Sequence, residues 1–316
     1  MAELSRDDVL AAREAIAGRL HRTPVFSSAT LGERTGASVH LKAELFQRTG
    51  SFKPRGVLTK LASLVPEEKR RGVIGISAGN HAQALAYCAA LEGIDALIVM
   101  WQGASPQKIE ATRAYGAEVD LEADGPAHAF DRLAELMEQT GRPLVHPFDD
   151  LFTIAGQGTV GLELLEDVPD TGVVVVPVGG GGLVSGIAVA VEGRRVVAVE
   201  PELSPSLHAA LQAGRPVPVQ PRSIADGLGA PFAGGNAVAI CSALGVESAL
   251  VTEEEIEEAF RFLYGRAKLA CEPAGAAATA ALLAGKISFE HGQTVVVVVS
   301  GGNAAPEIAS AILAAR

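Results

Sequence analysis

The chain has 316 residues and a mass of 32.5 kDa, a length that suggests two domains of typical size. Its net charge of -11 and its lack of a clustered basic segment exclude the phosphate-binding surface of a nucleic-acid-binding protein and disfavour an anionic membrane surface as a partner. No uncharged apolar run reaches the roughly 18 residues of a membrane-spanning helix, and the charged N-terminus lacks the apolar core of a secretion signal, so we expect no membrane association.

The first predicted strand, residues 39–44, is followed by the segment GSFKPRG at residues 50–56. Gly50 permits a close backbone approach, Ser51 can cap a helix, and Pro54 fits a first helical turn. Lys53 is therefore expected at a junction between a loop and a helix, with its side chain presented there instead of spread over a solvated face.

Short apolar runs predict the remaining strands, and alanine-rich stretches with a helical period lie between them. These strands are expected at residues 73–76, 96–100, 118–121, 173–176, 196–200 and 295–299. The runs of valine at 173–176 and 295–299 are continuous, which is typical of central parallel strands covered on both faces. Strands that alternate with helices predict an α/β fold with two open, twisted, mainly parallel sheets and flanking helices. We expect residues 50–147 to form a small inserted α/β domain, and residues 1–49 and 148–316 to form a larger one.

Two acidic stretches are interpreted as helix caps. Thr252 and Glu255 have the spacing of a capping box. His146, Asp149 and Asp150 could be imagined as metal ligands, but the proline within their segment HPFDD favours a loop whose acids cap a helix.

Three of the predicted strands end in glycine-rich turns, SAGN at residues 77–80, GGGG at 179–182 and SGGN at 300–303. Ligands of open parallel sheets bind at the carboxyl ends of the strands, so we expect the three turns to face one cleft. The four glycines of the second turn let successive backbone N–H groups converge at a helix start, which predicts a phosphate-binding loop. A dinucleotide site is disfavoured, because Val184 or Ser185 stands where its third glycine belongs.

The other two turns supply polar groups. Ser77, Asn80 and the N–H groups that open the following helix suit a small carboxylate, and His81 is interpreted as an anchor of this loop. The hydroxyl of Ser300, at the end of a buried strand, needs a hydrogen-bond partner. A lysine, a phosphate-binding loop, a carboxylate pocket and a buried hydroxyl together match a phosphorylated aldehyde that bonds covalently to the lysine. Pyridoxal phosphate is such a molecule.

The sequence as a whole resembles the fold type II pyridoxal-phosphate enzymes, whose fold is tryptophan synthase β-like, and within them the branch of threonine/serine dehydratases and serine racemases. The likeness runs from residue 21 to residue 303. Its motifs occur in the family's order and are HRTPVFSS, LKAELFQRTGSFKPRG, SAGNHAQALA, AYGAEV, HPFDD, IAGQGT, PVGGGGL, IADG, EPAGAA and SGGN.

The resemblance implies a role for each matching position. Lys53 would form the Schiff-base link to the cofactor and Ser300 would bond its pyridine nitrogen, while Phe52 and Asn80 would contact the ring and its 3′ oxygen. The residues that would bind the phosphate are Gly179, Gly180, Gly181, Gly182 and Leu183. The residues that would line the substrate carboxylate pocket are Ser77, Gly79, Asn80 and His81. Gly227 and Glu272 would lie near the other edge of the cofactor.

Two departures separate the branches of the family. Ala78 stands where racemases have a second serine on the face opposite the lysine, and Phe148 stands where racemases tend to carry asparagine. Both changes favour β-elimination, so we expect a dehydratase that converts L-threonine or L-serine into 2-oxobutanoate or pyruvate and ammonia, with Lys53 as general base. The alternatives are a serine racemase or a 3-hydroxyaspartate dehydratase with the same cofactor, a nicotinamide-dependent oxidoreductase, and a non-catalytic protein that binds pyridoxal phosphate.

The resemblance also maps a cation site. Racemase-like members hold a divalent ion at positions that match Glu200, Ser204 and Ser206. Ser206 supplies no charge, and hard divalent ions prefer several carboxylate oxygens, so we expect no tight magnesium or calcium site. A monovalent ion at Glu200 and Ser204 stays open.

The cysteines bear on the compartment. Cys88, Cys241 and Cys271 are far apart and show no CxxC spacing, which indicates a reducing environment. We therefore expect a cytoplasmic protein, a homodimer, whose partner is a small amino-acid substrate.

Overall fold

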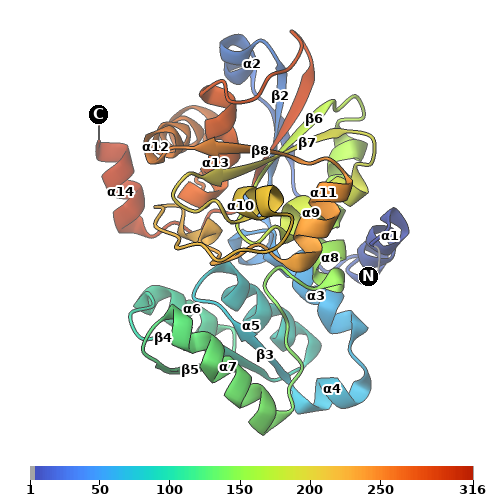
Figure 1. Cartoon of the computed structure of the whole chain (residues 1–316), viewed down its shortest axis with the longest axis vertical. Helices are drawn as coiled ribbons and strands as arrows, with labels where there is room; N and C mark the ends of the chain where they lie inside the picture. Colours follow the sequence, from blue (N-terminus) through green and yellow to red (C-terminus); the bar gives the residue numbers. More distant parts are fainter. Residues whose placement is uncertain (1–3, 316) are drawn as a thin grey trace.

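The computed structural model describes residues 4–315 and contains two separate β-sheets with helices on both faces of each (Figure 1). Its strands are β1 (Val25–Ser27), β2 (Ser38–Ala43), β3 (Val73–Ile76), β4 (Ala96–Trp101), β5 (Glu118–Ala123), β6 (Val173–Pro177), β7 (Arg195–Pro201), β8 (Glu247–Val251) and β9 (Thr294–Val299). Six of them form the larger sheet in the order β1-β2-β9-β6-β7-β8, and β3-β4-β5 form the smaller one. All neighbours are parallel except β1, which runs antiparallel to β2 at one edge.

The helices connect these strands and cover both sheets. They are α1 (Arg6–Ala15), α2 (Ala29–Thr35), α3 (Lys53–Ser63), α4 (Pro66–Arg71), α5 (Asn80–Glu92), α6 (Pro106–Ala114), α7 (Pro126–Thr140), α8 (Leu151–Asp167), α9 (Gly182–Ala190), α10 (Ser206–Ala213), α11 (Gly235–Ala243), α12 (Glu253–Phe262), α13 (Pro273–Leu283) and α14 (Pro306–Ala314). Short helical turns are η1 (Glu44–Phe46), η2 (Arg48–Gly50), η3 (Asp226–Leu228) and η4 (Leu263–Ala267). None of the helices formed by residues 4–315 is long and apolar enough to cross a membrane.

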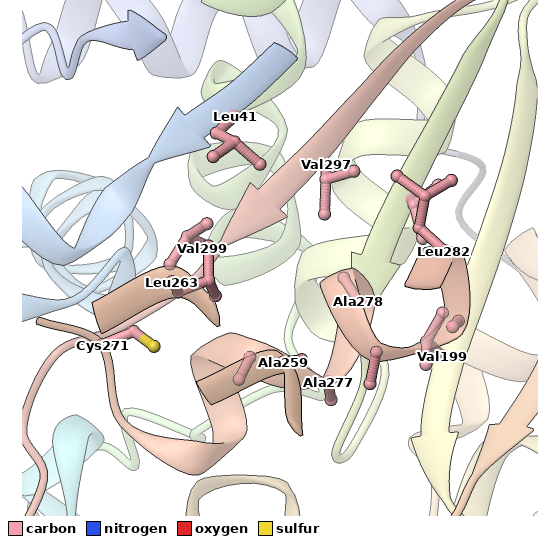
Figure 2. Packing of buried hydrophobic residues seen from close by; sticks show 14 of the residues in the cluster. Leu41, Val199, Ala259, Leu263, Cys271, Ala277, Ala278, Leu282, Val297 and Val299 are labelled. Atoms are coloured by element: carbon pink, nitrogen blue, oxygen red, sulfur yellow. The ribbon is translucent and has the colours of Figure 1, made fainter. Parts of the chain in front are cut away.

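The valine runs of β6 and β9 are buried on both faces of the larger sheet, as their continuous apolar sequence predicts. Successive side chains of a strand point to opposite faces, so alternate residues enter two different cores. Val297 and Val299 pack with residues of α12 and α13 on one face, as Figure 2 shows. Val296 and Val298 pack with residues of α8 and α9 on the other face.

The smaller sheet repeats this arrangement. Ile98 of β4 packs with residues of α3 and α5 on one face. The neighbouring Val99 packs with residues of α7 on the other face. The three strands lie within residues 73–123, inside the segment predicted to form an inserted domain. The exact division of the chain at residues 50 and 147 stays a prediction, because α3 packs both on α5 of the small sheet and on α8 of the large one.

The prediction of two mainly parallel sheets with flanking helices is confirmed, and each predicted strand is present. Two strands were missed, β1 and β8. Both are edge strands with partly exposed residues, so neither carries the continuous apolar run that marks a buried strand.

Candidate active site

A pocket lies at the carboxyl ends of β6 and β9. Its lining includes every residue predicted to bind the cofactor. These residues are Phe52, Lys53, Asn80, Gly179, Gly180, Gly181, Gly182, Leu183, Gly227, Glu272 and Ser300. The three glycine-rich turns therefore contribute to one pocket, as we expected from their position after parallel strands.

Lys53 is the first residue of α3, and Pro54 follows it in the first turn as predicted. The prediction that Ser51 caps this helix is wrong. Phe52 is the N-cap residue, and it makes no side-chain cap bond. The buried hydroxyl of Ser51 has no hydrogen-bond partner among the described residues, and its backbone instead forms a β-bridge with Gly301. This bridge, together with the bond from Phe52 N–H to Ser300 O (3.2 Å), ties the start of α3 to the end of β9.

The amine of Lys53 is enclosed at this junction. Its Nζ donates a hydrogen bond to Pro147 O at 2.8 Å and lies 5.2 Å from the centre of the Phe52 ring. Burial disfavours the ammonium form and lowers the pKa of Lys53 to about 8, although the nearby charge of Glu272 opposes this shift. A larger fraction of Lys53 is thus a neutral, nucleophilic amine near neutral pH than for an exposed lysine.

The tetraglycine turn opens α9 and presents unoccupied donors to the pocket. Within residues 4–315, no acceptor takes the amide N–H groups of Gly179 to Leu183. Gly181 has φ +93°, and a Cβ there would lie 2.5 Å from the Cβ of Ala237. A Cβ on Gly180 would lie 2.2 Å from the ring of Phe148. Only glycine allows this turn, and free N–H groups at a helix start are the donor set that a phosphate requires.

Asn80 and Glu272 meet on another wall of the pocket. Asn80 Nδ2 donates to Glu272 Oε1 at 2.6 Å. Burial raises the pKa of Glu272 to about 7, and the bond from Asn80 opposes this rise. Ser300, 3% exposed, ends β9 and lines the same pocket.

The structure brings only part of the predicted carboxylate pocket together with these groups. Asn80 lines the pocket, whereas Ser77, Gly79 and His81 do not. Gly79 N–H donates to Ser77 Oγ at 3.1 Å. His81 is buried, and its Nε2 donates to Val145 O at 2.9 Å, which is the anchoring role predicted from the sequence. Burial lowers the pKa of His81 to about 3, so its imidazole is neutral.

The predicted cation residues lie apart from this pocket. Glu200 and Ser204 are fully buried, and neither lines it. The Glu200 carboxylate accepts backbone N–H groups from Leu207 and His208, both at 2.7 Å, at the start of α10. Burial raises its pKa to about 7. The described residues contain no group of three or more histidine, cysteine or acidic side chains that could hold a metal ion.

Two residues at this site, Gln157 and Asn303, have no role predicted from the sequence. Gln157 lines the pocket, and its buried amide has no hydrogen-bond partner among the described residues. Gln157 belongs to the motif IAGQGT, so the family resemblance was the feature of the sequence that could have indicated it. Asn303, the last residue of the motif SGGN, donates to Asn80 Oδ1 at 2.8 Å.

Comparison with known proteins identifies the family. Residues 16–301 match the family described as pyridoxal-phosphate dependent enzyme, so the chain belongs to that family. The free N–H groups of the tetraglycine turn, the buried lysine and the serine at the strand end line one pocket, and their chemistry fits the phosphate, the aldehyde and the ring of this cofactor.

Several named proteins are similar to this chain along most of its length. It is 43% identical to the L-threonine ammonia-lyase of Thermotoga maritima, over 95% of this chain and 76% of that protein. It is 41% identical to the catabolic L-threonine dehydratase of Escherichia coli, over 94% of this chain and 92% of that protein. Among solved structures, maize serine racemase has a TM-score of 0.93 at 35% identity and covers 97% of this chain and 95% of its own. Threonine deaminase isoform 2 from Solanum lycopersicum, in its processed form, has a TM-score of 0.90 at 31% identity and covers 98% of this chain and 94% of its own.

Proposed function

We propose that the protein is a pyridoxal-phosphate-dependent L-threonine ammonia-lyase, which converts L-threonine into 2-oxobutanoate and ammonia, and L-serine into pyruvate and ammonia. The observation that carries the proposal is the placement of Lys53 Nζ in one pocket with the free N–H groups of the tetraglycine turn. The names of the ammonia-lyase and dehydratase relatives support the reaction.

The cofactor would be held at its two ends. Gly179 to Leu183 would bind the phosphate and Lys53 would bond the aldehyde carbon, with Phe52, Asn80, Gly227, Glu272 and Ser300 around the ring. When bound, pyridoxal phosphate supplies an electron sink for the bond that breaks at the substrate α-carbon. A serine hydroxyl at the pyridine nitrogen is a neutral partner, so Ser300 does not hold a proton there as a carboxylate partner would.

The chain's own proton transfer is assigned to Lys53. An amine with a pKa of about 8 is well matched to remove the α-proton of an amino acid near neutral pH. The backbone N–H groups at the start of α5, that of Asn80 among them, would hold the substrate carboxylate, and Ser77, Gly79 and His81 would shape that loop.

A serine racemase is the second candidate, favoured by the similarity to the maize enzyme. Racemisation needs a proton donor on the face of the substrate opposite Lys53. Ala78 has no hydroxyl, and its half-buried methyl group packs against the core around α5. This supports elimination. A 3-hydroxyaspartate dehydratase is a more distant candidate, because its substrate would bring a second carboxylate that needs a further partner.

The compartment, the oligomeric state and the division into domains are part of the same proposal. We propose a cytoplasmic homodimer with a small domain of residues 50–147, and the three cysteines, which are buried and free, suit a reducing compartment. Because both oxygens of Glu200 already accept N–H groups, we propose that Glu200 acts as a cap of α10, with at most a monovalent ion bound near Ser204.

The test is an assay of the purified protein, loaded with pyridoxal phosphate, for ammonia and oxo acid from a panel of β-hydroxy amino acids. We expect turnover with L-threonine and L-serine, and none with the variant Lys53→Ala. Chiral analysis of the remaining serine separates elimination from racemisation. Formation of D-serine in excess of pyruvate would replace the proposal by the racemase, and the absence of any cofactor absorbance would remove both.

A further inference from the structure

Asn303 lies in the loop after β9 and bonds to two other segments of the chain. One of its amide donors reaches Thr49 O, and the other reaches Asn80 Oδ1, each at 2.8 Å. Asn80 in turn donates through Nδ2 to Glu272 Oε1 at 2.6 Å. The four residues form one hydrogen-bonded chain from the loop before Lys53 to the wall of the pocket.

The direction of every bond in this chain follows from its ends. A backbone carbonyl only accepts, so the side of the Asn303 amide that faces Thr49 O must be its NH2 group. The same NH2 group meets Asn80, which therefore turns its oxygen towards Asn303. The NH2 group of Asn80 is left to face Glu272 and the pocket.

The Asn80 NH2 group has a second hydrogen, beyond the one donated to Glu272, and this hydrogen has no acceptor among the described residues. Nδ2 of Asn80 lies next to the pocket lining, since a Cβ on Gly227 would lie 3.9 Å from it. Asn80 thus offers the pocket an N–H donor and keeps its carbonyl oxygen away from it. A donor at this place suits an anionic oxygen of a ligand and disfavours a protonated one.

We propose that Asn303 is a positioning residue that fixes the side chain of Asn80 as a hydrogen-bond donor to the ring oxygen of the cofactor. This inference rests on the proposed function, because it assumes that pyridoxal phosphate binds in the pocket. It assigns to the last residue of SGGN a role in the ionisation state of the bound cofactor.

The approach of Asn303 depends on the unusual backbone that precedes Lys53. Gly50 has φ +72°, and a Cβ there would lie 2.5 Å from Asn303 Oδ1. Thr49 has φ 60°, a left-handed conformation that a β-branched residue adopts only under strain. The bond from Asn303 to Thr49 O helps to hold this conformation, so one amide organises both the loop of Lys53 and the donor at Asn80.

The sharpest variant is Asn303→Asp, which keeps the shape of the side chain and removes its donors. The introduced carboxylate can only accept, so Asn80 is expected to turn and donate to it. The carbonyl oxygen of Asn80 then faces Glu272 and the ring oxygen, which disfavours the anionic form of that oxygen. The expected result is a shift of the bound cofactor's absorbance from the visible band to the near-ultraviolet band of the protonated form, together with about tenfold weaker cofactor binding.

Spectra and cofactor affinities are measured for wild type, Asn303→Asp, Asn80→Ala and the double variant. If Asn303 acts through Asn80, Asn303→Asp changes the spectrum only when Asn80 is present, and the two effects are not additive. Equal spectral changes in the presence and absence of Asn80, or no change in Asn303→Asp, would overturn the inference. Gln139→Glu adds a negative charge on an exposed face of α7 and is expected to leave the spectrum unchanged.

A second variant guards against misfolding. Asn303→Ser removes the amide without adding charge, and it is expected to give a smaller spectral shift in the same direction. An unchanged spectrum in this variant contradicts the inference as well. If wild type itself binds no pyridoxal phosphate, the proposed function fails, an outcome distinct from a bound cofactor whose spectrum ignores Asn303.

Discussion

The pKa values of Lys53 and Glu272 move towards each other in the same pocket, from opposite directions. Burial lowers the pKa of Lys53 to about 8 and raises that of Glu272 to about 7, since it disfavours both charged forms. Each charge partly stabilises the other. The protein thus keeps the Lys53 amine and the Glu272 carboxyl close to their neutral forms. The raised pKa of Glu272 lowers the stability of the fold above neutral pH, and the lowered pKa of Lys53 lowers it below about pH 8.

The variant Glu272→Gln tests this for the cofactor-free protein. The pKa of Glu272 is higher in the folded protein than the value of 4.5 for a free side chain, so its contribution to stability is lost as pH rises from about 4.5 to about 7. Glutamine has no such loss. We expect similar unfolding free energies for variant and wild type near pH 5, and a variant that is more stable by about 1–3 kcal/mol near pH 8, by urea titration.

Comparison with wild type at each pH cancels the parallel contribution of Glu200, whose pKa is raised in the same sense. A variant that is less stable than wild type near pH 8 would show that the Glu272 carboxylate is stabilised by its neighbours and not penalised by burial.

At the residue scale, the sequence predicts most of the pocket but not its hydrogen-bond directions. The positions of Lys53 and of the tetraglycine turn were predictable from adjacent residues. Gly50 and Pro54 indicate a junction between a loop and a helix at Lys53, and the valine run before the four glycines indicates a turn after a buried strand. Ser51 was predicted to cap α3 and instead pairs its backbone with Gly301, a partner about 250 residues later. Asn303 was missed for the same reason, because its hydrogen-bond partners Thr49 and Asn80 lie far away in the sequence.

At the scale of elements, the start of α9 depends on the shape of the tetraglycine turn. Gly181 and Gly193 both have positive φ, +93° and +81°. A Cβ on Gly193 meets no atom within 4 Å, whereas one on Gly181 would collide with Ala237 of α11. Alanine would therefore suffer the same backbone strain at both positions, but its Cβ would meet a neighbouring atom only at position 181.

We expect Gly193→Ala to lower stability by about 1–2 kcal/mol and to leave cofactor affinity unchanged. Gly181→Ala should lower the affinity for pyridoxal phosphate by more than about tenfold, because the turn or α11 must move and the N–H groups no longer converge. Absorbance titration of the cofactor-free variants measures the affinities, and urea unfolding measures the stability. Equal affinities of the two variants would contradict a phosphate site in this turn.

A buried ion network joins the elements next to the pocket. Arg55 of α3 bonds Glu44 of η1 with both partners buried (2.8 Å) and Glu163 of α8 at 2.7 Å, and Lys42 of β2 bonds Glu163 at 2.6 Å. Glu163 has a lowered pKa because of Arg55 and Lys42, although its burial opposes this. The network fixes α3, and hence Lys53, to the large sheet and to α8.

Loss of one member leaves buried charges without partners. Arg55→Met is expected to lower the free energy of unfolding by about 3–5 kcal/mol, chiefly because Glu44 stays buried and uncompensated. The control is Arg70→Met, which removes an exposed pair with Glu67 and should cost less than about 1 kcal/mol. Urea unfolding of both variants gives the comparison, and similar losses would mean that the network contributes no more than a surface ion pair.

The helices and strands that could be predicted are those whose own residues carry a clear pattern. The continuous valines of β6 and β9, the capping box of Thr252 and the cap of α8 by Asp150 are present as predicted. The edge strands β1 and β8 were not predicted, since pairing with a neighbouring strand and not their own composition makes them strands.

At the scale of the whole molecule, the pocket is built by both sheets. The large sheet supplies the tetraglycine turn and Ser300, and helix α5, which packs on the small sheet, supplies Asn80 at its first position (Figure 1). An ion pair between Lys108 of α6 and Asp226 of η3 further joins the elements around the small sheet to those around the large sheet. Cofactor and substrate would thus bind where the two parts meet, so binding is expected to stabilise the chain as a whole.

A covalent bond between Lys53 and the cofactor can be trapped chemically. The protein is incubated with pyridoxal phosphate, treated with borohydride to reduce the carbon–nitrogen double bond to a stable amine, digested, and analysed by mass spectrometry. We expect one modified peptide, with the phosphopyridoxyl group on Lys53, and none in Lys53→Ala. A modification found mainly on another lysine, or undiminished in Lys53→Ala, would contradict it.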